Sequence, residues 1–412
     1  MSETAARPDE AMPDHAARAR SIAFLNWAHA VDHYVLLIFP TVVLQLEAVY
    51  HRPYSELIAL STACFVAFGV FSLPAGWLAD HWSRRNMMML FFGGCGLSLV
   101  AAALSPTPIV LAGSLLVLGI FSAIYHPVGM AMLIDASQAR GRTLAFNGVC
   151  GNLGAALAAG ITAAITTAFG WHAAFLIPAV LCLATVPLYW RAMPDDRHTG
   201  AKRVTAAGAR LAPVLAIIMF SLFMIIALAA GLTFNAVTVA LPKVVEERLG
   251  ENVSLAAVGS LATVVFMCGA LAQLAVGRLV ERIAPQNLLV FISAMGLAGI
   301  LWASQASGLW LMAALAVVMM SIYGQVTVND MVIARYSADA WRGRVYAVRY
   351  FLLFITSGAA IAMIAGLHEN GGFDLVFVAV AAVMAVFLVA TIGVAVIANG
   401  ASRRAVAAQP AE

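Results

Sequence analysis

The stretch LSTACFVAFGVFSLPAGWLAD, residues 60–80, decides the fold, because a second copy follows 201 positions later as LATVVFMCGALAQLAVGRLVE, residues 261–281. The aligned positions that are identical or chemically similar are Thr62 with Thr263, Phe65 with Phe266, Gly76 with Gly277 and Asp80 with Glu281. Pro40 and Pro242 align at almost the same shift, 202 positions. Several anchors at one offset predict two halves of the same fold and the same orientation.

The composition is that of a membrane protein. Apolar residues make up 63% of the 412 residues and charged residues only 10%, whereas a soluble domain has about 45–50% and about 25%. A soluble chain of this length could not cover its surface with so few charges. The formal net charge of +3 and the scattered basic residues argue against nucleic-acid binding. The five cysteines lie in apolar runs without metal-ligand spacing, so no metal or other cofactor is expected.

The apolar runs predict twelve transmembrane helices. A spanning helix needs about 20 mostly apolar residues, and the runs of this kind are 21–46, 55–79, 86–105, 108–134, 144–168, 173–192, 213–241, 254–279, 286–305, 308–334, 345–367 and 374–398. They do not alternate between apolar and polar residues as barrel strands would. We therefore expect an all-α membrane protein with twelve transmembrane helices in two six-helix, pseudo-symmetric halves.

The basic residues indicate the orientation. Of the 23 lysines and arginines, 19 lie in the two termini and in the loops after even-numbered helices. The positive-inside rule then places both termini in the cytoplasm, and we expect a multi-pass protein of a bacterial inner membrane. The predicted division is a cytoplasmic tail (1–20), an N-terminal bundle (21–192), a cytoplasmic linker (193–212), a C-terminal bundle (213–398) and a cytoplasmic tail (399–412).

The loop after the second predicted helix points to a family. Its sequence GWLADHWSRRN (76–86) resembles the signature Gly-x-x-x-Asp-x-x-x-Arg-Arg of the major facilitator superfamily, and GRLVERIAPQN (277–287) lies where that superfamily repeats it. The resemblance covers the whole chain and implies a transporter whose two halves rock to expose a central site to each side alternately. It also implies a gating role for the charged residues of both loops, which are Asp80, Arg84, Arg85, Glu281 and Arg282.

A narrower resemblance is confined mainly to the first half. The stretches HAVDHYVLLIFP (29–40), GIFSAIYHPVGMA (119–131) and FNGVCGNLGAAL (146–157) look like the fosmidomycin-resistance type of efflux protein. The helix containing residues 154–160 lacks the Gly-Pro ending that is common in antiporters. The direction of transport therefore stays open.

Asp32 is the strongest candidate for a proton site. It lies about halfway along the first predicted helix, with His29 and His33 close to it in sequence. A charge near the bilayer centre costs at least about 2.5–3.5 kcal/mol, so such a residue is a functional candidate. A buried carboxyl group beside imidazoles suits reversible proton binding. The alternative is a fixed ion pair or hydrogen bond between Asp32 and one histidine.

Other polar residues inside predicted helices are candidates for substrate binding: Asn26, Tyr125, His126, Asn235, Gln325, Asn329, Asp330, Tyr346 and Arg349. His126 precedes Pro127, which removes a backbone donor, so His126 is either a structural donor or a binding residue. Asp330 and Arg349 lie at similar depths in neighbouring predicted helices. They form either a buried latch or a site in which Arg349 holds an anionic substrate.

These features predict a secondary active transporter that exports a small amphipathic or anionic compound in exchange for protons. Proton-coupled uptake of a small organic anion is the alternative. The sequence has no Gly-x-x-x-x-Gly-Lys-Ser/Thr loop for ATP, and neither His-Glu-x-x-His nor Gly-x-Ser-x-Gly, so an intramembrane enzyme is a remote alternative. A sensor of transporter ancestry would normally carry a soluble domain. The expected partners are a small-molecule substrate, the proton and the lipid bilayer, and we expect a monomer.

Overall fold

The computed structural model describes residues 15–137, 140–193, 213–249, 253–336 and 339–407, and in these ranges it contains helices and no strand. The N-terminal helices are α1 (His15–Leu36), α2 (Ile38–Tyr50), α3 (Tyr54–Ala59), α4 (Thr62–His81), α5 (Arg84–Ala103), α6 (Pro108–Ser122), the π-helical turn η1 (Tyr125–Gly129), α7 (Met130–Ala136), α8 (Arg140–Phe169) and α9 (Trp171–Ala192). The C-terminal helices are α10 (Pro213–Leu249), α11 (Leu255–Leu279), α12 (Pro285–Gln305), α13 (Gly308–Tyr336) and α14 (Asp339–Ala407).

The predicted all-α membrane fold is confirmed. Within the described residues, 11 helical segments are long and apolar enough to cross a membrane. One of these, Val348–Gly400, has 53 residues, which is more than twice the length that one crossing needs. It is interrupted by non-helical backbone at Gly371 and Gly372, where two helices meet. Division at this break gives the two last helices that the sequence predicts and brings the count to about twelve.

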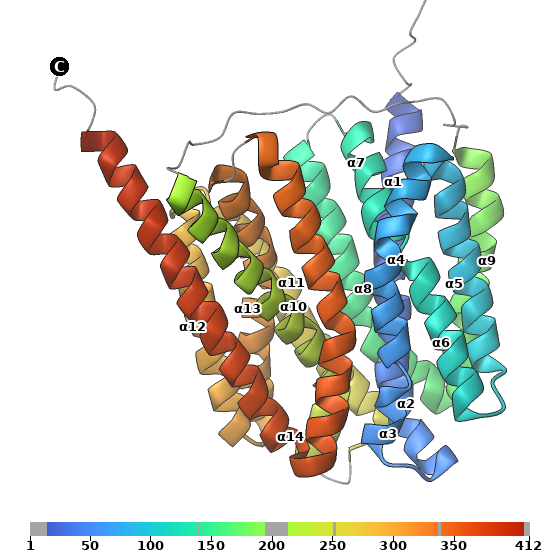
Figure 1. Ribbon diagram of the computed structural model, residues 1–412. Coiled ribbons are helices and arrows are strands. Elements are labelled where there is room, and N and C mark those ends of the chain that lie inside the picture. Colours follow the sequence, from blue (N-terminus) through green and yellow to red (C-terminus); the bar gives the residue numbers. More distant parts are fainter. Residues whose placement is uncertain (1–14, 138–139, 194–212, 250–252, 337–338, 408–412) are drawn as a thin grey trace, which may run out of the picture.

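The helices form two bundles side by side (Figure 1). Helices α1–α9 make up one bundle and α10–α14 the other, and α1 begins at the same face at which α14 ends. Large apolar side chains are exposed on both bundles, for example Leu97, Ile109, Ile217 and Val264. An exposed apolar surface of this extent suits contact with lipid.

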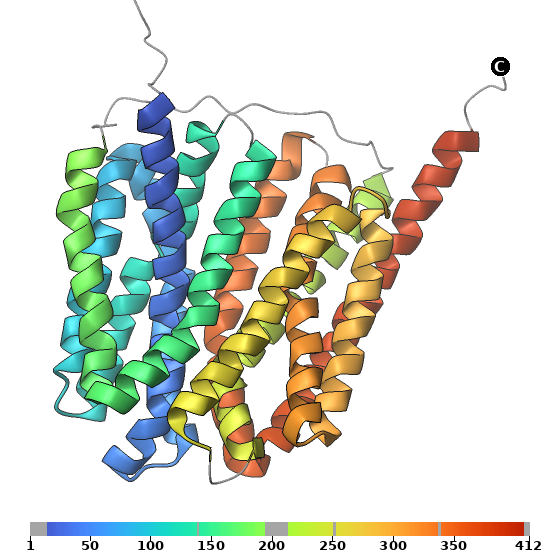
Figure 2. The same ribbon diagram turned by 180° about the vertical axis from the view of Figure 1, so that it is seen from behind.

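Two long helix pairs make the main contacts between the bundles: α8 lies along α11, and α4 lies along α14 (Figures 1 and 2). Thr263 ties the first pair, since its hydroxyl donates to the Ala156 carbonyl at 2.7 Å and accepts from the Gly160 amide at 3.0 Å. In the second pair, a Cβ built on Gly69 would lie 2.8 Å from the Phe354 carbonyl oxygen. Glycine at this crossing allows the two backbones to approach closely.

Prolines explain why two predicted helices are not continuous. The predicted helix 21–46 is divided at Leu37 into α1 and α2, because Pro40 lacks an N–H and its ring displaces the carbonyl four residues earlier. In the predicted helix 108–134, Pro127 lies within η1, where the turn widens to the π-helical form. Such turns are frequent at functional sites, and this one contains the candidate residues Tyr125 and His126.

Candidate functional site

Asp32 belongs to a cluster of titratable side chains in the N-terminal bundle. His29, Asp32 and His33 come from α1, and His126 comes from η1. The Asp32 side chain is only 1% exposed, and its Oδ2 lies 3.4 Å from His126 Nε2. Neither carboxylate oxygen accepts a hydrogen bond from the residues that the structure describes. The distance allows an ion pair when His126 is protonated, but the carboxylate is otherwise left without partners.

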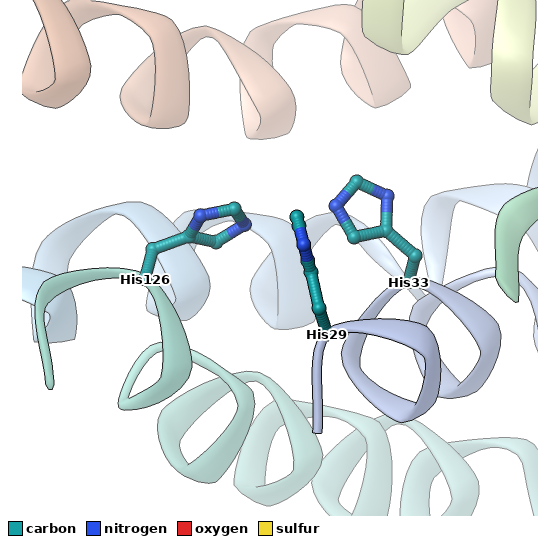
Figure 3. Close-up of side chains that lie close together, drawn as sticks. All are labelled: His29, His33 and His126. Carbon is teal, nitrogen blue, oxygen red and sulfur yellow. The ribbon is translucent and has the colours of Figure 1, made fainter. Parts of the chain in front are cut away.

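The three imidazole rings lie close together, edge to face (Figure 3). Their ring centroids are 4.9 Å apart for His29 and His33, 5.4 Å for His29 and His126, and 5.7 Å for His33 and His126. The ring of Tyr125 stacks on His29 at 4.8 Å. The structure therefore brings the predicted proton-coupling residues together with Tyr125 and His126, which the sequence had assigned to substrate binding.

Asn147 on α8 holds this cluster in place. Its backbone carbonyl accepts a hydrogen bond from His29 Nδ1 at 2.8 Å, and its side-chain oxygen accepts one from the Tyr125 hydroxyl at 3.1 Å. Its amide nitrogen donates to Asn26 Oδ1 at 2.9 Å. Asn26, a predicted binding residue, thus belongs to the frame around His29. Asn147 was not among the predicted site residues, and its only signal in the sequence is that it is a polar residue inside an apolar helix.

The C-terminal bundle has a second polar cluster. Arg349 on α14 forms an ion pair with Asp330 on α13, as the sequence predicted. The Arg349 side chain is 5% exposed and that of Asp330 is 35% exposed. The residue before Asp330, the buried Asn329, donates a hydrogen bond to the buried Gln325 one turn earlier on the same helix.

Aromatic rings connect the two clusters. The guanidinium of Arg349 lies 5.3 Å from the centroid of the Tyr350 ring, which stacks with Phe354 at 6.0 Å. Phe354 in turn lies 4.9 Å from the ring of His126 in the other bundle. This row of rings runs from the predicted substrate residues of α14 to the predicted proton site of the N-terminal bundle.

A family model described as Major Facilitator Superfamily matches residues 22–355 of this chain. The chain belongs to the Major Facilitator Superfamily. Solved structures of low sequence identity share the fold. A bacterial homologue of the human lysosomal transporter Spinster, in an inward-facing and occupied conformation, aligns with a TM-score of 0.73 at 13% identity over 95% of this chain and 98% of that one. A POT family transporter in complex with 5-aminolevulinic acid aligns with a TM-score of 0.70 at 13% identity, over 93% and 96% of the two chains.

Two curated relatives match parts of this facilitator. A gallate transporter of Pseudomonas putida is 28% identical over 160 residues, which are 36% of this chain and 35% of the relative. A multidrug efflux pump of Mycolicibacterium smegmatis is 31% identical over 128 residues, which are 30% of this chain and 25% of the relative. The matches thus span about a third and a quarter of the relatives' lengths.

The predicted gating residues of this facilitator lie at the face where α1 begins. Arg84 donates to Asp135 at 2.6 Å and to Asp80 at 3.1 Å, which ties the ends of α4, α5 and α7 together. Arg85 donates to the Trp190 carbonyl at 2.5 Å. The second copy of the loop places Glu281 and Arg282 in the turn between α11 and α12.

Two further predicted binding residues stay predictions. Asn235 on α10 donates to the Gly231 carbonyl of its own helix at 2.8 Å, and this bond leaves its side-chain oxygen available as an acceptor. Tyr346 belongs to α14, but its side chain lies outside the described residues.

Proposed function

We propose that this facilitator exports a small amphipathic or anionic compound in exchange for protons, by alternating access between its two bundles. The observation that supports proton coupling is the carboxylate of Asp32, which is fully buried, accepts no hydrogen bond from the described residues and lies 3.4 Å from the imidazole of His126. A buried charge with so few compensating contacts raises the free energy of the protein. Protonation of Asp32 removes this charge, and the free energy released can drive a reversible conformational step.

The proton site communicates with the interface between the bundles through His126. Protonation of Asp32 removes the negative charge that lies 3.4 Å from His126 Nε2. His126 also contacts Phe354 of the C-terminal bundle. A change of charge at Asp32 therefore alters a contact between the bundles, and alternating access requires a link of this kind.

The C-terminal cluster supplies the recognition of substrate. Arg349 presents a planar fork of donors that suits a carboxylate or phosphonate. Gln325 and Asn329 offer amide groups on α13, close to Asp330 in the sequence. The rings of Tyr350 and Phe354 form an apolar wall next to the guanidinium. A compound with an anionic group joined to an apolar or aromatic body would contact both the guanidinium and the rings. Asp330 would compete for Arg349 and release it when the substrate binds.

Export is favoured by the resemblance of the first half to the fosmidomycin-resistance type and by the similarity to a multidrug efflux pump. Proton-coupled uptake of an organic anion is the second candidate, and the similarity to a gallate transporter favours it, since gallate is an aromatic carboxylate. In either case we propose a monomer in a bacterial inner membrane with both termini in the cytoplasm, as the distribution of basic residues predicts.

The decisive experiment measures transport in proteoliposomes with an imposed proton gradient. Asp32→Asn keeps the size of the side chain but cannot bind a proton reversibly, so we expect loss of proton-driven transport while exchange of substrate for substrate continues. Asp374→Asn, which changes an exposed carboxylate paired with Arg248, is the matched control and should retain proton-driven transport. Proton-driven transport that persists in Asp32→Asn with an unchanged pH dependence contradicts the proposal. The gradient direction that drives accumulation separates export from uptake.

The substrate class is found by a thermal-shift screen of anionic, cationic and neutral compounds on the protein in detergent. A ligand at 100 times its dissociation constant stabilises the folded state by about 2.7 kcal/mol. Arg349→Lys keeps the charge but loses the fork of donors, so anions should stabilise the wild type more than this variant. Stabilisation by lipophilic cations alone would mean that Arg349 is a latch and that the protein is a multidrug exporter.

A further inference from the structure

The three histidines of the N-terminal cluster have the arrangement of metal ligands. His29 and His33 are four residues apart on α1, so both rings project from one face of the helix. His126 faces them from η1 (Figure 3). One ring nitrogen from each of the three lies within 4.8 Å of the other two. The spacing of His29 and His33 alone did not predict a metal site, because the third ligand comes from a turn 93 positions further along the chain.

Asp32 is the candidate for a fourth ligand. Its buried carboxylate has no hydrogen-bond donor among the described residues, and it contacts the three-histidine cluster through His126. Ligand atoms around a tetrahedral Zn²⁺ with bonds of about 2.0 Å are about 3.3 Å apart. The 3.4 Å between Asp32 Oδ2 and His126 Nε2 already matches that spacing. The distances among the three imidazole nitrogens reach up to 4.8 Å, and movement of the His33 and His126 side chains would close them, since the Asn147 carbonyl holds His29.

His29 is oriented as metal-binding histidines are. Its Nδ1 lies 2.8 Å from the Asn147 carbonyl oxygen, and because a carbonyl only accepts, Nδ1 carries the hydrogen and Nε2 keeps its lone pair. Metal-ligating histidines almost always donate their other N–H to a carbonyl or carboxylate in this way. A methyl group on Gly151 would lie 2.5 Å from Nε2 and 2.7 Å from both Cδ2 and Cε1. These near-equal distances place Gly151 against the face of the ring, so the lone pair in the ring plane is not covered.

We propose that His29, Asp32, His33 and His126 bind one divalent transition-metal ion of the Zn²⁺ class. Three imidazoles and one carboxylate suit Zn²⁺, Co²⁺, Ni²⁺ or Cu²⁺ and do not suit Mg²⁺ or Ca²⁺, which take oxygen ligands. The contact between His126 and Phe354 places this ion where the two bundles meet, so it exchanges as the bundles move. The inference goes beyond the proposed export of an anionic compound, because it assigns a cation to the N-terminal cluster and makes protons and metal ions competitors for it.

The first test is metal binding by the full-length protein in detergent after removal of any affinity tag. Titration with Co²⁺ should give the intense visible absorption of a tetrahedral complex at one ion per chain, and Zn²⁺ should displace it. His33→Asn and His126→Asn should each weaken Zn²⁺ binding by at least about 10-fold. His172→Asn removes a histidine that stacks on Trp171, outside the cluster, and should leave the affinity unchanged.

Three results would overturn the site: no binding at micromolar Zn²⁺, an octahedral Co²⁺ spectrum, or an affinity that neither cluster variant changes. If the variants fail to fold, X-ray absorption of the Zn²⁺-loaded wild type decides, since imidazole scattering must account for three ligands. Transport measurements on the same proteins distinguish failure of the metal site from failure of the proposed proton coupling. Loss of proton-driven transport in Asp32→Asn together with no metal binding by the wild type refutes only the metal site. Metal binding without proton-driven transport in the wild type refutes only the coupling.

Discussion

Asp330 and Arg349 form an ion pair, but they differ in burial, so each depends on its partner to a different degree. Arg349 is almost completely buried, while about a third of the Asp330 side chain is exposed. The guanidinium therefore depends on the carboxylate more than the carboxylate depends on it. Variants of the two residues therefore test whether the pair is a latch that stabilises the fold or whether Arg349 binds an anionic ligand.

We expect Asp330→Asn to destabilise the protein more than Arg349→Gln does. The first change leaves a buried cation without this carboxylate, at a cost of about 3–5 kcal/mol, and the second leaves a carboxylate that solvent partly reaches. Thermal unfolding of both variants and of the double variant in detergent measures the difference. A double variant that is as stable as the wild type would support a pair that is dispensable for folding. Equal losses in both single variants would contradict the argument from burial.

A second prediction for a single residue concerns the loss of stability when Asn147 is replaced. Its side chain bonds Tyr125, Asn26 and the Leu25 carbonyl, so Asn147→Ala removes three hydrogen bonds and leaves buried polar groups behind. Hydrogen bonds inside membrane proteins contribute about 0.6–1.7 kcal/mol each, so we expect a loss of about 2–5 kcal/mol and a lower melting temperature. The control Asn235→Ala removes one bond to its own helix and should cost less. A smaller effect at Asn147 than at Asn235 would rule out its role as the frame of the cluster.

At the scale of helices, close packing of the bundles depends on small residues where helices cross. Gly69 on α4 faces the backbone of α14, where a Cβ would lie 2.8 Å from the Phe354 carbonyl oxygen and 3.0 Å from Ile355 Cα. Backbone atoms cannot move aside as a flexible side chain can. Any side chain at Gly69 therefore pushes α4 away from α14, and Phe354 away from His126.

We expect Gly69→Ala to lower the stability by about 1–3 kcal/mol through this overpacking, and to slow transport. Gly113→Ala is the matched control, because no atom lies within 4 Å of a Cβ built there. Its higher helix propensity should make it neutral or up to about 1 kcal/mol more stable. Melting temperatures and initial transport rates of the two variants give the comparison, and equal behaviour would show that α4 and α14 separate more easily than the structure indicates.

At the scale of the whole molecule, an ion pair joins the bundles at the face opposite the chain ends. Lys243 of α10 is buried and pairs with Glu47 of α2, and it also contacts Glu246 at 2.7 Å and the ring of Tyr54 at 5.4 Å. This contact holds the two bundles together at that face. Alternating access requires it to open in each cycle.

We therefore expect that a cross-link across this contact stops transport reversibly. The variant Glu47→Cys/Lys243→Cys, in a background without the five native cysteines, should lose transport when a cleavable bifunctional thiol reagent joins the two sites, and regain it on cleavage. Arg248→Cys/Asp374→Cys is the control, because both residues lie within the C-terminal bundle, so a link between them does not join the two bundles. Undiminished transport by the cross-linked first pair would mean that this face stays closed throughout the cycle.

The sequence by itself determined the membrane environment, the all-helical fold and the family, because these follow from the length and spacing of apolar runs, the internal repeat and one signature loop. It also selected Asp32, His29, His33 and His126 one by one, since polar residues are costly in a bilayer wherever they lie. The tertiary structure alone decided which of them meet. The four-residue spacing of His29 and His33 indicates one helix face, but the approach of His126, the support from Asn147 and the row of rings to Arg349 depend on how separate helices pack.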